Sequence, residues 1–135
     1  MKIEINNQTN CKIDLRQVEK VVKVFSRVYK IDKNKEISLA FVGDAEIKKL
    51  NKSYRGLNKP TDILSFPGEG DFFGEIIIDY DQIKRQAVDF KNSAEKELIF
   101  ILTHGLLHLI GHDDKTDKKR EKMIKIGEQF IKNYL

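Results

Sequence analysis

The chain has no tryptophan, one cysteine, two prolines and only three histidines among its 135 residues. Without tryptophan, a core has to be built from isoleucine, leucine, valine and the eight phenylalanines. The single Cys11 excludes an internal disulfide, which is typical of a protein from the reducing cytosol. We expect Cys11 to be a small, half-buried side chain without a chemical role. The length predicts one domain, residues 1–135, with one hydrophobic core.

Long hydrophobic runs are also absent from this sequence. The longest apolar stretch, Leu98–Ile110, is interrupted by His104 and His108 and is shorter than the ~20 residues that a membrane span needs. The first ten residues, MKIEINNQTN, lack the apolar run of a signal peptide. We therefore expect a cytoplasmic protein with no membrane partner. Its net charge of +4 slightly favours an anionic partner such as nucleic acid.

Hydrophobic periodicity predicts nine elements in the order β-α-β-α-β-β-α-α-α. Apolar runs indicate strands at residues 2–7, 36–42, 63–66 and 75–79, with polar loops at residues 51–62 and 68–74. Capping residues indicate helices that begin at Asp14, at Asp79 or Asp81, and at Asn92. Two further helices are expected after the turn at Gly43–Asp44 and from Thr116 to the C-terminus. This order predicts an α+β fold in which about five helices pack on a small mixed four-stranded sheet.

The predicted helix after Asn92 is polar for one turn and then apolar on all sides, so we expect it to be the buried central helix. Gly111 is well placed to end it, because glycine enters left-handed conformations at little cost. In the helix before it, Ile83, Ala87 and Phe90 share one apolar face by their spacing. We expect that face to pack against the core.

All three histidines lie within HGLLHLIGHDD, residues 104–114, together with two carboxylates. His104 and His108 are four residues apart on the predicted helix, so their rings project from one face and can reach one ion. A turn at Gly111 can bring Asp114 to the same ion. The layout H-x-x-x-H-x-x-G-x-x-D is the zinc-binding pattern of metzincins with aspartate in place of the third histidine. A lone histidine on an apolar face is more often hydrogen-bonded in a core, but this combination favours a metal site.

Gly105 occupies the position at which H-E-x-x-H peptidases carry the glutamate that deprotonates the metal-bound water. No other carboxylate in the helix replaces that glutamate, since Glu97 lies about two turns back. A peptidase mechanism therefore lacks its base. Attack by metal-activated water is still suited to a phosphodiester, because the negative charge of that substrate is the main obstacle to its hydrolysis.

A phosphodiester also needs a cation near its developing negative charge. Arg55 is the best candidate, because a guanidinium group binds phosphate oxygens bidentately. Lys52 and Lys59 flank Arg55 in the sequence and can steer an anionic strand toward it. Taken alone, an exposed arginine in a polar loop is more often a solvated surface charge.

Three segments, HGLLHLIGHDD, YRGLNKPTDILSFP and FGEIIID, resemble in order and spacing the motifs of the YbeY family of bacterial metal-dependent endoribonucleases. That family acts in ribosomal RNA maturation and ribosome quality control. The resemblance implies that His104 and His108 are two zinc ligands and that Arg55 is the family's essential arginine. It also implies a single-strand-specific endoribonuclease whose partners are ribosomal RNA or the ribosomal subunits.

The chain departs from the family motif H-G-x-L-H-L-x-G-Y-D-H at two positions. The family's third histidine ligand falls on Asp114, and its tyrosine falls on His112. Aspartate can coordinate zinc through an oxygen, so Asp114 is the expected third ligand and His112 is the rival. The resemblance also suggests that Ser65, with Thr61 and Asp62, lines the substrate groove. Capping a turn or ending a strand are the alternative roles of these three residues.

These observations lead to one main interpretation and two alternatives. The main interpretation is a zinc-dependent endoribonuclease with one ion per chain and no nucleotide cofactor. The first alternative is a non-catalytic, zinc-containing ribosome-assembly factor that docks through the lysine-rich segment Lys115–Lys125. The second is a metallopeptidase or another metal-dependent hydrolase, against which Gly105 argues.

Overall fold

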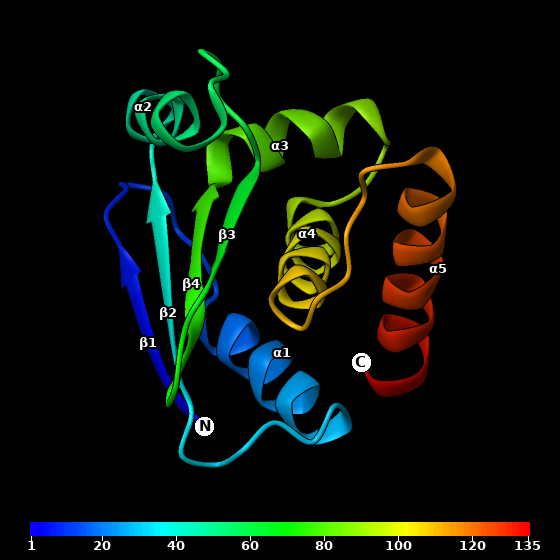
Figure 1. The fold of residues 1–135 in the computed structure, drawn as a ribbon. Helices are drawn as coiled ribbons and strands as arrows, with labels where there is room; N and C mark the ends of the chain where they lie inside the picture. Colours follow the sequence, from blue (N-terminus) through cyan, green and yellow to red (C-terminus); the bar gives the residue numbers. More distant parts are fainter.

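A four-stranded mixed sheet and five helices form the computed structural model, which describes residues 1–135 (Figure 1). The strands are β1 (Lys2–Asn7), β2 (Glu36–Val42), β3 (Ile63–Pro67) and β4 (Phe72–Asp79). The helices are α1 (Leu15–Val28), α2 (Asp44–Arg55), α3 (Tyr80–Asp89), α4 (Ala94–Leu109) and α5 (Asp117–Tyr134). The element order and the α+β class agree with the prediction from sequence, which is thereby confirmed.

The strands lie in the order β1-β2-β4-β3, so β3 forms one edge of the sheet. β1, β2 and β4 are parallel to one another, and β3 runs antiparallel to β4. The register places one row of residues on the face that packs against the core: Ile5, Leu39, Ile76 and Ser65. The next row, on the opposite face, contains Glu4, Ser38, Glu75 and Phe66.

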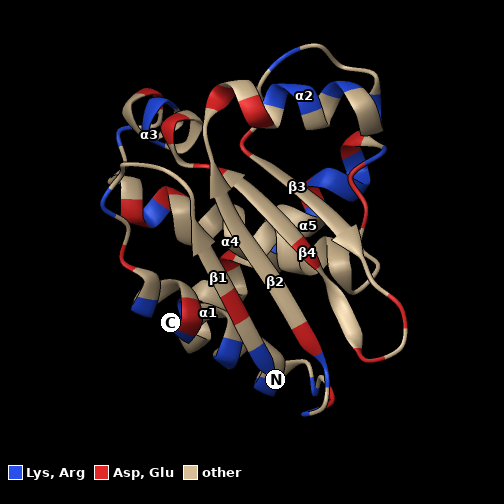
Figure 2. Ribbon diagram, turned by 90° about the vertical axis from the view of Figure 1, so that its left-hand side faces the viewer, with Lys and Arg blue, Asp and Glu red and all other residues tan.

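Helices cover the two faces of the sheet unequally. The main core joins one face to α1, α4 and α5, and its fully buried members include Leu39, Ile76, Leu102 and Leu106. On the other face, α2 covers only one end of the sheet, as Figure 2 shows. There a smaller cluster is formed by Val42, Ile47, Leu64 and Ile77. The strands therefore carry apolar residues on both faces at the end near α2 and polar residues on one face at the other end.

Helix α4 is the central helix that the sequence predicts. It contacts α1, α3, α5, β3 and β4, and Figure 1 shows it between the sheet and α5. Its first turn is capped by the Ser93 side chain, which accepts a hydrogen bond of 3.1 Å from the Lys96 backbone N–H. The expected cap, Asn92, is one residue too early, because its backbone N–H donates to the Ala87 carbonyl and closes the end of α3.

Three local predictions are wrong. The loop expected at residues 51–62 is helical up to Arg55, and α2 ends because Gly56 takes a left-handed conformation with φ of +71°. Strand β4 begins at Phe72 and not at Glu75, since Phe72 pairs with β2. Phe90 is 67% exposed, because α3 ends one residue before it and turns its side chain out of the apolar face.

No helix is both long and apolar enough to cross a membrane.

Candidate functional site

Helix α4 brings the two histidines of its last turns together. The rings of His104 and His108 lie edge to face, with centroids 4.9 Å apart and planes inclined by 83°. The helix then ends in two hydrogen bonds, from the Gly111 N–H to the His108 carbonyl and from the His112 N–H to the Leu107 carbonyl. This is the glycine-dependent Schellman motif, and Gly111 has the positive φ (+104°) that the motif needs. The motif reverses the chain and sends it back over the histidine face.

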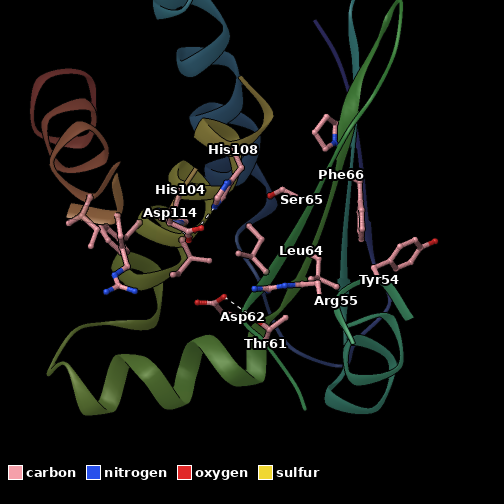
Figure 3. Close-up of a pocket in the computed structure, with 16 residues that line it drawn as sticks. Tyr54, Arg55, Thr61, Asp62, Leu64, Ser65, Phe66, His104, His108 and Asp114 are labelled. Carbon is pink, nitrogen blue, oxygen red and sulfur yellow. Dashed lines mark hydrogen bonds and ion pairs between the residues drawn. The ribbon is translucent and has the colours of Figure 1, made fainter. Parts of the chain in front are cut away.

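The reversed chain places Asp114 against both imidazoles (Figure 3). Asp114 Oδ2 lies 3.5 Å from His104 Nε2 and 3.6 Å from His108 Nε2, and all three atoms lie within 4.8 Å of one another. In a tetrahedral zinc site with bonds of ~2.0–2.1 Å, the ligand atoms are ~3.3–3.4 Å apart. The three donor atoms and their spacing therefore fit a metal ion, and only small movements of the side chains would be needed to bind it.

Hydrogen bonding orients one of the two imidazoles. His108 Nδ1 lies 3.0 Å from the backbone carbonyl of His112, which can only accept a hydrogen bond. His108 Nδ1 therefore carries the proton, and the lone pair is on Nε2, which faces Asp114. His112 thus contributes its main chain to the cluster, and its side chain is not among the three groups that converge.

The protonation states also suit metal binding. Burial, and next the neighbouring His108, lower the pKa of His104, which favours the neutral imidazole that a metal requires. Asp113 does not share this environment. Its carboxylate accepts a hydrogen bond from the Lys115 backbone N–H and lies 3.4 Å from Lys119 Nζ. Of the two adjacent aspartates, only Asp114 faces the histidines.

The three converging side chains lie on the wall of a cavity of about 710 Å³. The cavity lies between α4, β3, the start of α5 and the end of α2, and Arg55, Thr61, Asp62 and Ser65 also line it. In Figure 3, Arg55 extends from the end of α2 toward Asp62 on the same side of β3 as the histidines. Arg55 forms no ion pair within the chain, so its guanidinium group is available to an anion.

Lys52 and Lys59 do not line this cavity. Both side chains are exposed, Lys52 in the last turns of α2 and Lys59 in the loop that follows. The Lys59 carbonyl accepts a hydrogen bond of 2.9 Å from the fully buried Asn51 side chain, which ties this loop to α2. The two lysines therefore add positive charge beside the cavity and not inside it.

Strand β3 and helix α4 are in close contact at Ser65 and Gly105. The Ser65 hydroxyl donates to the Gly105 carbonyl at 3.2 Å. A Cβ atom at Gly105 would lie 2.5 Å from Ile63 Cδ1 and 3.0 Å from Ser65 Oγ. The place where a peptidase of the H-E-x-x-H type carries its glutamate is thus filled by strand β3.

A second group of polar side chains lies deeper, where α3 meets α4. Gln86 Nε2 donates to Asp62 Oδ2 at 3.1 Å. Glu97 is buried nearby, and burial, followed by the charge of Asp62, raises the pKa of Glu97. Asp62 is thus held by α3 as well as by its position at the start of β3.

Two polar residues that line the cavity are not among those that the sequence analysis selects. Arg120, from the first turns of α5, pairs with Asp117 at 2.5 Å and reaches the cavity from the side opposite β3. Tyr54 precedes Arg55 and packs against Phe66, with ring centroids 4.9 Å apart. The sequence feature that could have identified Tyr54 is its place in the Y-R-G segment. No sequence feature identifies Arg120, because its approach to the cavity depends on how α5 packs against α4.

The fold and the site together define a class: an α+β protein whose central helix and following turn form a two-histidine, one-aspartate cluster that can bind a metal ion in an open cavity. The sequence model of the family described as Endoribonuclease YbeY matches residues 3–135. The chain therefore belongs to the endoribonuclease YbeY family, which confirms the resemblance seen in its motifs.

Similar proteins cover nearly the whole chain. Endoribonuclease YbeY of Phytoplasma australiense is 37% identical over an alignment of 140 positions, which covers 98% of this chain and 94% of that protein. The protein of the same name from Acholeplasma laidlawii is 35% identical over 133 residues, which span 96% and 95%. The solution structure of TM1509 from Thermotoga maritima matches with a TM-score of 0.65 and 30% identity, over 96% of this chain and 87% of that one.

Proposed function

We propose that this chain is a zinc-dependent endoribonuclease that cuts single-stranded RNA in ribosomal RNA maturation and ribosome quality control, with one ion per chain. The observation that carries the proposal is the convergence of His104, His108 and Asp114 within a cavity that Arg55 also lines. Membership of the endoribonuclease YbeY family supports RNA as the substrate.

His104, His108 and Asp114 are the residues that would hold the ion. When bound, zinc lowers the pKa of a coordinated water toward ~7 and so supplies a nucleophile at neutral pH. The His112 carbonyl keeps the Nε2 lone pair of His108 directed at the ion site. Strand β3 packs on Gly105 and leaves no room for a side chain at this position of the helix.

Arg55 has the task of binding the phosphate. Its guanidinium group presents several N–H donors in a plane and can contact two phosphate oxygens at once, which stabilises the charge that develops during cleavage. Arg85 and Arg120 have carboxylate partners at 2.8 Å and 2.5 Å, whereas Arg55 has none. Binding a phosphate therefore costs Arg55 no existing ion pair.

Three further residues assist in binding the strand. Lys52 and Lys59 attract it from outside the cavity, through long-range charge that salt weakens. Ser65 lines the cavity, and its hydroxyl oxygen keeps acceptor capacity while it donates to Gly105. We place the RNA along β3, between the end of α2 and the start of α5, and we infer ribosomal RNA or ribosomal subunits as the source of that strand.

The mechanism is tested by metal analysis together with cleavage of a short unstructured RNA. We expect about one zinc per chain, and we expect chelation to stop cleavage and added zinc to restore it. Arg55→Ala should keep the metal and lose about 100-fold or more in kcat, because it removes a contact to the developing charge. Arg27→Ala, an exposed arginine of α1 outside the cavity, is the control. Cleavage that continues unchanged in chelator would reject the metal mechanism.

The third ligand is tested by a pair of variants. Asp114→Ala should lower zinc affinity strongly, because it removes one of three donor atoms. His112→Ala should keep the stoichiometry of one, since its carbonyl remains to orient His108. The reverse pattern, with zinc lost in His112→Ala and kept in Asp114→Ala, would assign His112 as the ligand.

A further inference from the structure

The aromatic pair of Tyr54 and Phe66 lies at the rim of the cavity and has no part in the metal-binding cluster. Both residues line the cavity, and their rings are 4.9 Å apart and inclined by 58°. Tyr54 is 67% exposed although its ring packs on Phe66. Its hydroxyl group has no hydrogen-bond partner in the chain. The pair therefore leaves a large part of one aromatic ring available at the mouth of the site.

The strand β3 separates this pair from the histidines. Phe66 belongs to the row of Glu75 and Ser38, on the sheet face away from α4, whereas Ser65 faces α4. Figure 3 shows Tyr54 and Arg55 on opposite sides of β3, with Arg55 directed toward Asp62. Two consecutive residues at the end of α2 thus present a cation on one side of the edge strand and an aromatic ring on the other.

A cation beside an exposed aromatic ring is the arrangement with which proteins bind single-stranded nucleic acid. The cation holds the phosphate, and the ring stacks on a base, which is possible for every base because each has a π-face. Phe66 is half-buried against the cluster of Val42, Ile47 and Leu64, so it holds the Tyr54 ring in place before RNA arrives. A ring that is already ordered loses little conformational entropy on binding.

We propose that Tyr54, supported by Phe66, forms a stacking subsite for an unpaired nucleobase next to the phosphate that Arg55 binds. This inference rests on the proposed function, since it needs RNA in the cavity. It gives a physical reason for a preference for single strands. A base inside a duplex has both faces covered by its neighbours, whereas an unpaired base offers a face to Tyr54.

The subsite is tested with Tyr54→Leu, which removes the aromatic face but keeps an apolar side chain on Phe66. Tyr54→Phe keeps the ring. Tyr134→Leu is the matched control, because Tyr134 is also exposed and also packs on a phenylalanine, Phe130, but does not line the cavity. We expect Tyr54→Leu to raise KM about 5- to 150-fold with kcat within about threefold, as for a stacking contact that is equal in ground and transition states. Tyr54→Phe and Tyr134→Leu should stay within about twofold of the unaltered protein.

Abasic substrates separate stacking from a structural role. The affinity of each protein is measured by fluorescence anisotropy on a series of short RNAs, each lacking one base, in chelator so that the strands stay uncut. In the unaltered protein, loss of the base at one position should weaken binding by the same factor as Tyr54→Leu. In Tyr54→Leu, removal of that base should have no further effect.

Three outcomes bear on the inference in different ways. A Tyr54→Leu protein that binds and cleaves RNA normally overturns the subsite and leaves the proposed function intact. The same conclusion follows if, at every position, removal of the base weakens RNA binding by Tyr54→Leu as much as it weakens binding by the unaltered protein. If the unaltered protein neither binds nor cleaves RNA with zinc present, the proposed function fails and the subsite fails with it.

Discussion

Gly105 shows how closely the helix that carries the histidines approaches the edge strand. The contacts of 2.5 Å and 3.0 Å that a Cβ atom would make there involve Ile63 and Ser65, and Ile63 is itself buried. Tight cores tolerate an added methyl group poorly, because neighbouring side chains must leave their preferred rotamers. The close spacing between α4 and β3 at this point therefore requires a residue without a side chain.

This close contact predicts a compensating pair of substitutions. Gly105→Ala should destabilise the protein by about 1–2 kcal/mol, since overpacking outweighs the helix propensity that alanine gains. Ile63→Val removes the Cδ1 atom that lies 2.5 Å away, so the double variant should recover most of that loss in a urea titration. Gly127→Ala on α5 is the control, because its Cβ would make ordinary contacts of 3.7 and 3.8 Å and should cost nothing. Additive effects of the two substitutions would show that this contact is not the cause.

The histidine pair and Asp114 could be predicted from the sequence because their geometry is local. Helical spacing puts residues four apart on one face, and a glycine allows the chain to reverse within a few residues. Tyr54 and Arg120 could not be selected in this way. They reach the cavity only because α2 and α5 are packed on either side of β3 and α4, and such long-range packing has no periodic signal in the chain.

At the level of elements, the junction of β4 and α3 contains an unusual carboxyl group. Asp79 is fully buried and caps α3 by accepting a hydrogen bond from the Gln82 N–H at 3.3 Å, but its Oδ2 atom has no partner. Burial, and next the neighbouring Asp44, raise the pKa of Asp79 to about 7. Arg85 contacts both oxygens of Asp44, at 3.2 and 2.8 Å, and its hydrogen bond lowers the pKa of Asp44 to about 2. One carboxyl group of the pair is thus charged, and the other tends to keep its proton.

Asp79 should make the stability of the protein fall with rising pH. Its folded pKa of about 7 lies above the unfolded value of ~3.9, so between about pH 4 and pH 7 only the native state keeps the proton. Stability is therefore lost across this window, by about 1.4 kcal/mol for each unit between the two pKa values. Asp79→Asn keeps the cap without the charge, so its advantage in urea midpoint over the unaltered protein should be larger at pH 8 than at pH 4.5. For Asp81→Asn, on the same helix, the difference in urea midpoint from the unaltered protein should not increase between pH 4.5 and pH 8. If the difference for Asp79→Asn is the same at both pH values, the explanation is wrong.

The proposed metal ligands join α4 to the segment that leads into α5. Because the unfolded chain has no such arrangement, zinc should stabilise the native state, by about 2.7 kcal/mol at a free concentration 100 times its Kd. We expect a concentration-dependent rise in Tm on adding zinc to the metal-free protein. His108→Ala should abolish the rise, whereas Lys118→Ala, an exposed residue of α5, should retain it. An equal rise in both variants would show that zinc stabilises the protein elsewhere.

The element boundaries show which sequence signals decide where helices begin and end. The cap at Asp14 lies where the sequence predicts it and accepts a hydrogen bond from the N–H three residues later. The helix expected from Thr116 begins at Asp117, because Thr116 is its cap and accepts a hydrogen bond from the Lys119 N–H. The start of α4 is one residue off, because Asn92 and Ser93 are equally good caps and only the packing of α3 decides between them. Polarity is a poor guide to the end of α2, because lysine, serine, tyrosine and arginine are compatible with a solvent-exposed helix and only Gly56 stops it.

On the scale of the whole molecule, charge is distributed unevenly between the two sides of the sheet. Figure 2 shows acidic segments on strands β1, β2 and β4, on the face that the main core does not cover. Glu4 and Glu75 lie in one row of that face, with Ser38 between them. The cavity on the other side collects Arg55 from α2 and Arg120 from α5. Asp62 and Asp114 line the same cavity, so its attraction for a polyanion depends on Arg55, on Arg120 and on the ion that Asp114 would help to hold, and not on the net charge of +4 alone.

This distribution predicts a salt dependence that belongs to the cavity and not to net charge. Each phosphate contact to a single strand contributes ~0.7 to the slope of log K against log salt concentration, so Arg120→Ala should reduce that slope by about this amount. It should weaken binding equally for RNAs of different sequence, because phosphate contacts carry no sequence information. Arg27→Ala changes the net charge equally but lies on α1 in a separate hollow with Arg16 and Lys20, so its slope should match that of the unaltered protein. Equal losses of slope in both variants, measured by anisotropy from 50 to about 300 mM salt, would mean that overall charge alone attracts RNA and that Arg120 has no contact with the strand.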